Sequence, residues 1–364
     1  MRDAVRMLGR AGLAAGLLIA THASAYLISP RLAVHETMTR MAFACAARAT
    51  TEPKACWTGT ARLDVAKGKF TPDEMAVRWP DDPIRKADSA LTMASLAKDI
   101  VHDCPKEIKD AAGTDRTIYD AGLTCSSHYG RLQFLHAMAS TGDADRKATL
   151  RKIYAWAAFT YDVATGRVAL DLDLCKAVTP AWGGKPAYAP LAEAFEASPG
   201  SCDFAGAKDR GMTIRAFFTT DCGGKVRLPG KPCGPSDGTS AKPGAEGDAL
   251  ARRTAIGALM HLIQDSYSQS HVARPINGEA VAFMGPFTAT VACTFPVRYF
   301  DYGTQQFYDN HADGDAAPVL DASCASGAVA EPVTASAVAW WKVGRNRPTA
   351  EMIAWLTAHV FGPL

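Results

Sequence analysis

The feature that most constrains this chain is an apolar segment, residues 255–263, that carries a histidine and leads into an aspartate. Every residue of the segment is apolar or glycine except His261, a pattern typical of a helix that is buried on all sides. His261 and Asp265 are four positions apart and therefore share one helix face. A carboxylate in an apolar interior is costly unless it is paired or binds a metal. The segment therefore predicts a buried His–Asp pair or a metal site.

A second histidine, His271, follows ten residues after His261. On a continuous helix, at about 100° per residue, it would point within about 80° of the direction of His261. Three metal-binding side chains would then converge on one side. A core His–Asp hydrogen bond, with His271 at a helix end, explains each histidine singly, but the three together favour a metal site.

The His–Asp spacing recurs at His311 and Asp315, one helical turn after Phe307. Gly314 weakens a regular helix here, and Asp309 and Asp313 make a solvated acidic loop an equally good interpretation.

The N-terminal 25 residues have the pattern of a cleavable signal peptide. Three arginines precede a short apolar stretch at 11–20, and Ala23-Ser24-Ala25 supplies small residues for cleavage. The sequence therefore predicts a secreted or periplasmic protein. No apolar run approaches the length of a membrane span, so no transmembrane span is expected.

The predicted signal peptide changes how the net charge and the cysteines are interpreted. The full chain has 39 basic and 37 acidic residues, a net charge of +2. Removing residues 1–25 takes away three arginines and one aspartate, which leaves no net charge and gives no sign of a strongly basic nucleic-acid surface.

The ten cysteines all follow residue 25, and in an oxidising compartment they predict disulfides. Sequential neighbours are plausible pairs, and the connectivity is left open.

Helical periodicity dominates wherever the pattern is clear, so we expect an all-α fold. Two less regular blocks, about 102–127 and 166–247, interrupt it as cysteine-bearing loop insertions, and 333–361 is expected to form one or two amphipathic helices. Residues 26–364 are taken as a single helical domain. The periodic stripes are Met38, Met41, Ala42 and Cys45; Leu132, Leu135, His136 and Ala139; and Leu150, Ile153, Tyr154 and Ala157.

The ordered set of motifs resembles the zinc-dependent phospholipase C superfamily, which includes the single-strand-specific zinc nucleases. The main element is His261-x3-Asp265-x5-His271, followed by His311-x3-Asp315. Three shorter matches precede it in the expected order: His35 near the start of the mature chain, Trp79-Pro80-Asp81, and Ser127-His128-Tyr129. The resemblance implies a multi-helix domain of that superfamily, here with disulfide-stapled loop insertions, that binds up to three Zn²⁺ ions.

Carried over residue by residue, the resemblance implies three groups of ligands. Asp81, His128, His261 and Asp265 would hold one zinc ion, and His271, His311 and Asp315 a second. His35 and a second oxygen of Asp265 would hold a third, completed by the amine and carbonyl of the mature N-terminal residue, here Tyr26.

The sequence departs from the family pattern at several places. The N-terminal residue of the family is Trp, where this chain has Tyr26, and the glycine before the helix aspartate is Gln264. The proline two residues before the third ligand is Gln269. Asp82 remains an alternative to Asp81, and His136 an alternative to His128, although a core histidine is the favoured role for His136. His102 and His359 receive no role.

The resemblance implies a secreted zinc-dependent hydrolase of phosphoric esters that uses metal-activated water, with Asp81 as a candidate proton acceptor. Imidazole and carboxylate ligands suit Zn²⁺, and clustered zinc ions activate water and stabilise the leaving oxygen. The absence of net charge slightly favours a phospholipase C-like activity on phospholipid head groups. Three features favour single-stranded nucleic acid as the substrate instead, namely Asp315, the Trp79-x-Asp81 motif and the many cysteines. A non-catalytic zinc-binding or structural helical protein is a third possibility, and protein partners are not predicted.

Overall fold

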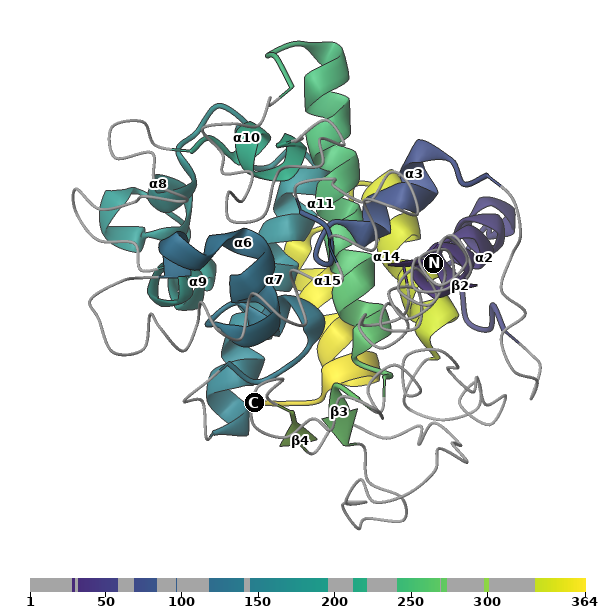
Figure 1. Ribbon diagram of the computed structural model, residues 1–364. Helices are drawn as coiled ribbons and strands as arrows, with labels where there is room; N and C mark the ends of the chain where they lie inside the picture. The colour runs from purple at the N-terminus through teal and green to yellow at the C-terminus, as the bar shows by residue number, and fades with distance from the viewer. Residues whose placement is uncertain are drawn as a thin grey trace, which may run out of the picture.

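The computed structural model describes residues 28–29, 32–57, 69–83, 96, 118–140, 145–195, 212–220, 241–268, 270–273, 298–300 and 331–364. These residues form a helical structure, which confirms the all-α prediction (Figure 1). No helix among them is long and apolar enough to cross a membrane. The longer helices are α2 (Val34–Arg48), α6 (Ile118–Tyr129), α7 (Arg146–Ala164), α11 (Ala245–Asp265), α14 (Pro332–Gly344) and α15 (Thr349–Leu356).

Short elements connect the longer helices. Two antiparallel pairs of two-residue strands are β1 (Ile28–Ser29) with β2 (Leu32–Ala33), and β3 (Val272–Ala273) with β4 (Arg298–Tyr299). The short helical elements are α3 (Pro72–Met75), η2 (Ala76–Arg78), η4 (Gln133–His136), α8 (Leu174–Val178), η5 (Pro180–Trp182), η6 (Pro186–Tyr188), α9 (Ala189–Ala194), α10 (Ile214–Thr219) and the π-helical turn η8 (Thr357–Phe361).

Helix α11 is the central element of the fold, with α7 on one side and α14 and α2 on the other (Figure 1). From Thr254 to Asp265 every residue of this helix is buried, as the apolar pattern at 255–263 predicts. Gly257 allows the closest approach, because a Cβ added there would lie 2.3 Å from the carbonyl oxygen of Ala76 in η2. The missing side chain therefore lets η2 lie directly on α11.

An aromatic group between α7, α10 and η2 forms much of the core. The Trp156 ring lies 6.0 Å from that of Trp79, and Trp79 also packs on Phe217 and Phe218 at 5.0 and 5.1 Å. Burial of such side chains is the largest favourable contribution to folding. Trp79 thereby anchors the turn that leads to Asp81.

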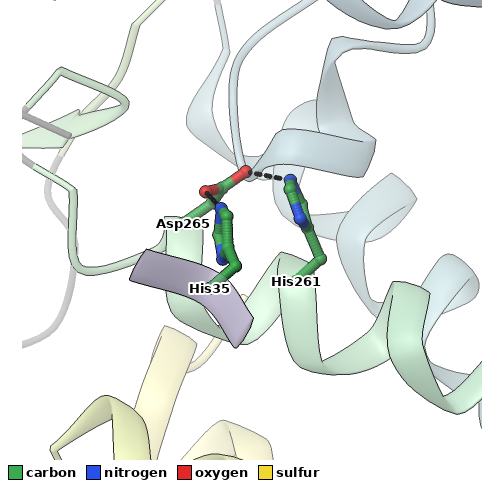
Figure 2. A group of neighbouring side chains, drawn as sticks. All are labelled: His35, His261 and Asp265. Carbon is green, nitrogen blue, oxygen red and sulfur yellow. Dashed lines mark ion pairs between the residues drawn. The ribbon is translucent and has the colours of Figure 1, made fainter. Parts of the chain in front are cut away.

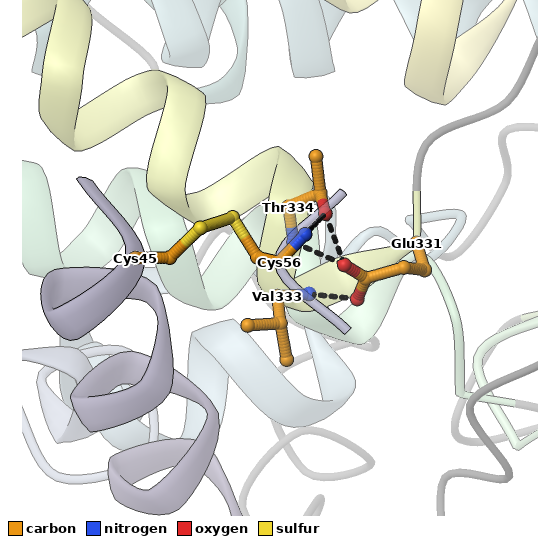
Figure 3. Close-up of a disulfide and its surroundings, with 5 residues drawn as sticks. All are labelled: Cys45, Cys56, Glu331, Val333 and Thr334. Atoms are coloured by element: carbon orange, nitrogen blue, oxygen red, sulfur yellow. Dashed lines mark hydrogen bonds between the residues drawn. A yellow bond between two sulfur atoms is a disulfide. The ribbon is translucent and has the colours of Figure 1, made fainter. Parts of the chain in front are cut away.

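A disulfide and a helix cap hold α2 against α14 (Figure 3). Cys45 in α2 is bonded to Cys56, and the main-chain N–H of Cys56 donates to the Thr334 hydroxyl at 2.7 Å. The carboxylate of Glu331 accepts from the N–H groups of Val333 and Thr334 and so caps the start of α14. Cys45 and Cys56 are sequential neighbours, and every cysteine of the described residues, including Cys125 and Cys175, is disulfide-bonded.

Three local predictions need correction. The stripe at 132–139 forms only η4, because Ala137 has a positive φ of 53° and Ala139 donates its N–H to Phe300 rather than to a helix. The block at 102–127 is not irregular throughout, since α6 begins at Ile118. The block at 166–247 likewise contains α8, α9 and α10.

A further correction concerns the helix that was expected to continue to His271. Helix α11 ends at Asp265, and the chain turns so that the N–H of His271 donates to the Ser268 carbonyl at 3.1 Å. Phe300 then donates its N–H to the carbonyl of His271 at 2.9 Å, which joins this turn to the β3–β4 pair. A local turn and a tertiary hydrogen bond from Phe300 thus replace the helical hydrogen bonds that periodicity predicted.

Candidate metal centre

Seven buried histidine and aspartate side chains from six separate parts of the chain meet at the C-terminal end of α11. None of them is more than 2% exposed. His261 and Asp265 are on α11, His35 is in the first turn of α2, and His128 is near the end of α6. Asp81 follows η2, His136 ends η4, and His271 lies just before β3.

Asp265 lies at the centre of this cluster. Its Oδ1 is 3.3 Å from His35 Nε2, and its Oδ2 is 2.9 Å from His261 Nε2. Figure 2 shows the carboxylate directing one oxygen toward each of these two rings, which stack with their centroids 4.1 Å apart. Oδ2 also lies 3.0 Å from His136 Nδ1 and 3.5 Å from His271 Nδ1. One carboxylate is therefore shared by four imidazoles.

Asp81 forms a second centre beside the first. Its Oδ1 lies 3.8 Å from both His128 Nε2 and His136 Nδ1, and 3.9 Å from His261 Nε2. The ligand atoms of two triads, His35–His261–Asp265 and Asp81–His128–His136, each fall within 4.8 Å of one another, so each triad could hold a metal ion.

Main-chain carbonyls orient three of the histidines. Nδ1 of His261 donates to Val77 O at 2.9 Å, Nδ1 of His271 to His136 O at 2.7 Å, and Nδ1 of His128 to Thr124 O at 2.7 Å. A carbonyl oxygen can only accept, so the proton of each neutral ring is on Nδ1 and Nε2 carries the lone pair. This is the tautomer that metal-binding histidines adopt when their second nitrogen donates to a carbonyl.

The protonation states leave two electron-pair donors in close contact. Burial lowers the pKa of His261 to about 4, against the opposing effect of the Asp265 charge. At neutral pH the lone pair of His261 Nε2 therefore faces the carboxylate oxygen of Asp265 at 2.9 Å. The same Nε2 also lies within hydrogen-bond distance of His136 Nδ1, at 3.0 Å. A bound cation would relieve the repulsion between His261 and Asp265, so this donor set fits a metal ion.

Two further groups of the cluster, His136 and Asp265, also have shifted pKa values. Burial also lowers the pKa of His136 to about 4, so His136 is neutral and its Nδ1–H can donate to Asp265. Burial alone would raise the pKa of Asp265, but attraction to His261 and His271 and hydrogen bonds from the histidines hold it well below its usual value. An ionised Asp265 with neutral His136 and His261 has the protonation states that Zn²⁺ requires of its ligands.

An ion pair between the buried Glu36 and the partly buried Arg78 positions the two N-terminal parts of the cluster. The guanidinium of Arg78 donates to the carboxylate of Glu36, the residue after His35. The carbonyl of Arg78 accepts from the N–H of Asp81 at 3.1 Å. The Glu36–Arg78 pair therefore ties the helix that carries His35 to the turn that carries Asp81.

Six of the nine metal ligands expected from the sequence come together in this cluster, namely His35, Asp81, His128, His261, Asp265 and His271. Tyr26, His311 and Asp315 lie outside the described residues, as do His102 and residues 1–25. Asp82 is buried next to Asp81 but belongs to neither triad. His359 packs on Trp355 in the C-terminal turn, at a ring distance of 4.9 Å.

The sequence favours a core histidine at His136, with replacement of His128 as the alternative. The structure buries the ring and also places it beside His128 and Asp81, in one group that could hold a metal ion. The available signal was a histidine on an apolar stripe, where a polar side chain needs a buried partner.

Comparisons with known proteins identify no relative: no family model matches the chain, and neither the curated proteins nor the solved structures contain a match.

Proposed function

We propose that this protein is a zinc-dependent hydrolase of phosphoric esters whose metal centre is the His/Asp cluster at the end of α11. The observation that carries the proposal is the pair of buried triads, in each of which the ligand atoms of three His and Asp side chains lie within 4.8 Å of one another. The proposal includes the finer fold, a helical domain of the phospholipase C/zinc nuclease type. It also includes export from the cell, in keeping with the disulfide-bonded state of every described cysteine.

The two triads supply the ligands of the proposed site. His35, His261 and Asp265 would hold one zinc ion, and Asp81, His128 and His136 a second, with His271 directed toward Asp265. When bound, zinc would polarise the phosphoryl oxygen and lower the pKa of the attacking water.

The remaining steps belong to the chain itself. The carbonyls of Val77, His136 and Thr124 hold three imidazoles in the ligand tautomer, so no reorganisation is needed before zinc binds. The Oδ1 atom of Asp81 lies close to His128 and His261, where a carboxylate can accept a proton from water as it attacks. Burial of the cluster excludes bulk solvent and strengthens each electrostatic interaction within it.

A phospholipase C-like activity remains the first candidate, because the mature chain is expected to carry no net charge. Trp79 does not favour the nuclease, because its ring packs in the aromatic core against Trp156 and Phe217 and so has a structural role.

The test is to assay the zinc-loaded mature protein on phosphatidylcholine and on single-stranded DNA and RNA, together with metal analysis. We expect hydrolysis of the lipid, at least one zinc ion per chain, and loss of both in His261→Ala. The matched control is His359→Ala, a histidine packed on Trp355 away from the cluster. Turnover of nucleic acid alone would select the nuclease, zinc without turnover would leave a non-catalytic zinc protein, and less than one zinc ion per chain would refute the metal centre.

A further inference from the structure

His35 differs from the three histidines that main-chain carbonyls orient, because its Nδ1 contacts a side chain. The ring nitrogen lies 2.6 Å from Oε1 of Gln264, the residue that precedes Asp265 on α11. Both side chains are fully buried. The Gln264 amide therefore occupies the place that a peptide carbonyl has at His261, His271 and His128.

The other end of this amide is held as well. Nε2 of Gln264 donates to the Thr39 hydroxyl at 3.1 Å and to the Ser336 hydroxyl at 3.3 Å. Thr39 is on α2 and Ser336 is on α14, and neither is exposed. With the NH₂ group directed to two hydroxyls, the carbonyl oxygen is left facing His35, where it can only accept.

The orientation of Gln264 decides what His35 offers to Asp265. With its proton on Nδ1, His35 presents the lone pair of Nε2 to Asp265 Oδ1 at 3.3 Å, a contact that suits a bridging cation. With the proton on Nε2, the same two atoms would form an ordinary His–Asp hydrogen bond and the ring would not be ready to bind a metal. The Gln264 amide therefore decides whether His35 is ready to bind a metal ion or only forms a hydrogen bond to Asp265.

We propose that Gln264 is a positioning residue that holds His35 in the Nδ1–H tautomer and so makes its Nε2 a metal ligand. The inference rests on the proposed metal centre but concerns a residue that does not itself bind the ion. It also accounts for a glutamine within a buried apolar helix, where a polar side chain needs partners for all its groups.

The first experiment measures the tautomer in the wild-type protein, both metal-free and zinc-loaded, by ¹⁵N NMR of its histidine rings. We expect the Nδ1 of His35 to be protonated in both states at neutral pH. A proton on Nε2 in the metal-free protein would overturn the inference, whatever the zinc content.

The second experiment measures zinc affinity by competition with a chelator in Gln264→Met and Gln264→Glu. Methionine keeps the length of the side chain and removes the acceptor, so we expect the ion held by His35 to bind about 10–100-fold more weakly. Glutamate can only accept at this position, and we expect it to restore the affinity. Affinity equal to the wild type in Gln264→Met would overturn the inference.

A double-mutant cycle with His35→Ala separates positioning from a general loss of packing. If Gln264 acts through His35, Gln264→Met should not weaken zinc binding further once the ring is gone. An equal loss in both backgrounds would assign Gln264 a purely structural role. A wild-type protein that binds no zinc at all would instead refute the proposed function and leave the tautomer measurement as the test of Gln264.

Discussion

Gly257 of α11 lies directly against the carbonyl group of Ala76, with no room for a side chain between them. This contact brings η2 onto α11 one helical turn before His261, whose Nδ1 then reaches the carbonyl of Val77 at 2.9 Å. The same approach places Asp81 Oδ1 3.9 Å from His261 Nε2. The absence of one methyl group therefore sets the geometry of the metal centre.

Gly257→Ala should destabilise the protein and weaken zinc binding. An added Cβ would meet the carbonyl oxygen of Ala76 at 2.3 Å and its carbon at 2.4 Å, so the two backbones must separate. Overpacking of this kind costs about 1–3 kcal/mol, which equals or exceeds the gain of about 1 kcal/mol in helix propensity. Chemical denaturation and chelator competition measure the two effects.

The matched control is Gly344→Ala at the end of α14, where an added Cβ meets nothing within 4 Å. It should leave stability and zinc affinity unchanged or slightly higher. Equal effects of the two substitutions would contradict the role of close packing at Gly257.

Arg78→Met should cost more stability than the loss of a surface ion pair. It leaves the fully buried carboxylate of Glu36 without its guanidinium partner, which typically costs about 3–5 kcal/mol. The turn that carries Asp81 loses its link to α2, so zinc affinity should fall as well. Thermal unfolding and metal analysis provide the readouts.

The pair Arg347–Glu351 is a suitable comparison, since its side chains are 48% and 39% exposed. Glu351→Gln should change the free energy of unfolding by no more than about 0.5 kcal/mol and should leave zinc binding intact. A similarly small effect of Arg78→Met would argue against the buried pair as a positioning device.

His136→Ala should weaken zinc binding about 10–100-fold or remove one zinc ion per chain, because the imidazole lies within hydrogen-bond distance of both Asp265 and His261. Its Nε2 is buried and makes no hydrogen bond within the described part of the chain. His359→Ala, which removes a ring that packs on Trp355, should retain all the zinc. Equal zinc content and affinity in the two variants would return His136 to the role of a core histidine.

The metal-free protein should lose stability as the pH falls from about 6.5 to about 4. Burial lowers the pKa of His136 and of His261 from 6.5 to about 4, so between these values the unfolded chain binds more protons than the folded one. The loss is on the order of 3 kcal/mol for each histidine. Asp265, whose pKa is also lowered, contributes stability above its unfolded pKa that is lost as the pH falls through its folded pKa.

Denaturant unfolding across this pH range measures the effect in the metal-free protein. His136→Gln removes one of the titrating groups and should make the dependence shallower. Stability that stays constant or rises on acidification would show that these histidines are not held neutral in the folded state.

The sequence by itself predicted those helices whose own segment shows a clear pattern of apolar side chains. The apolar segment at 255–263 gave a buried helix with His261 and Asp265 on one face, and the stripes beginning at Met38 and Leu150 lie in α2 and α7. Their periodicity is enough because burial on one face and hydrogen bonding within the helix are properties of adjacent residues. The resemblance to zinc hydrolases named six residues that the fold brings together, and their role as ligands remains a prediction.

The tertiary structure alone decided how these residues meet. After Asp265 the chain leaves the helix, and His271 bonds to Ser268 and Phe300. After His136 the chain leaves η4, because Ala137 has a positive φ and Ala139 donates its N–H to Phe300. The place of His136 in a triad and the contact of Gln264 with His35 each join residues more than a hundred positions apart. Periodicity carries no information about such pairs, because the partner of a buried polar group is set by which elements pack together and not by its neighbours in the chain.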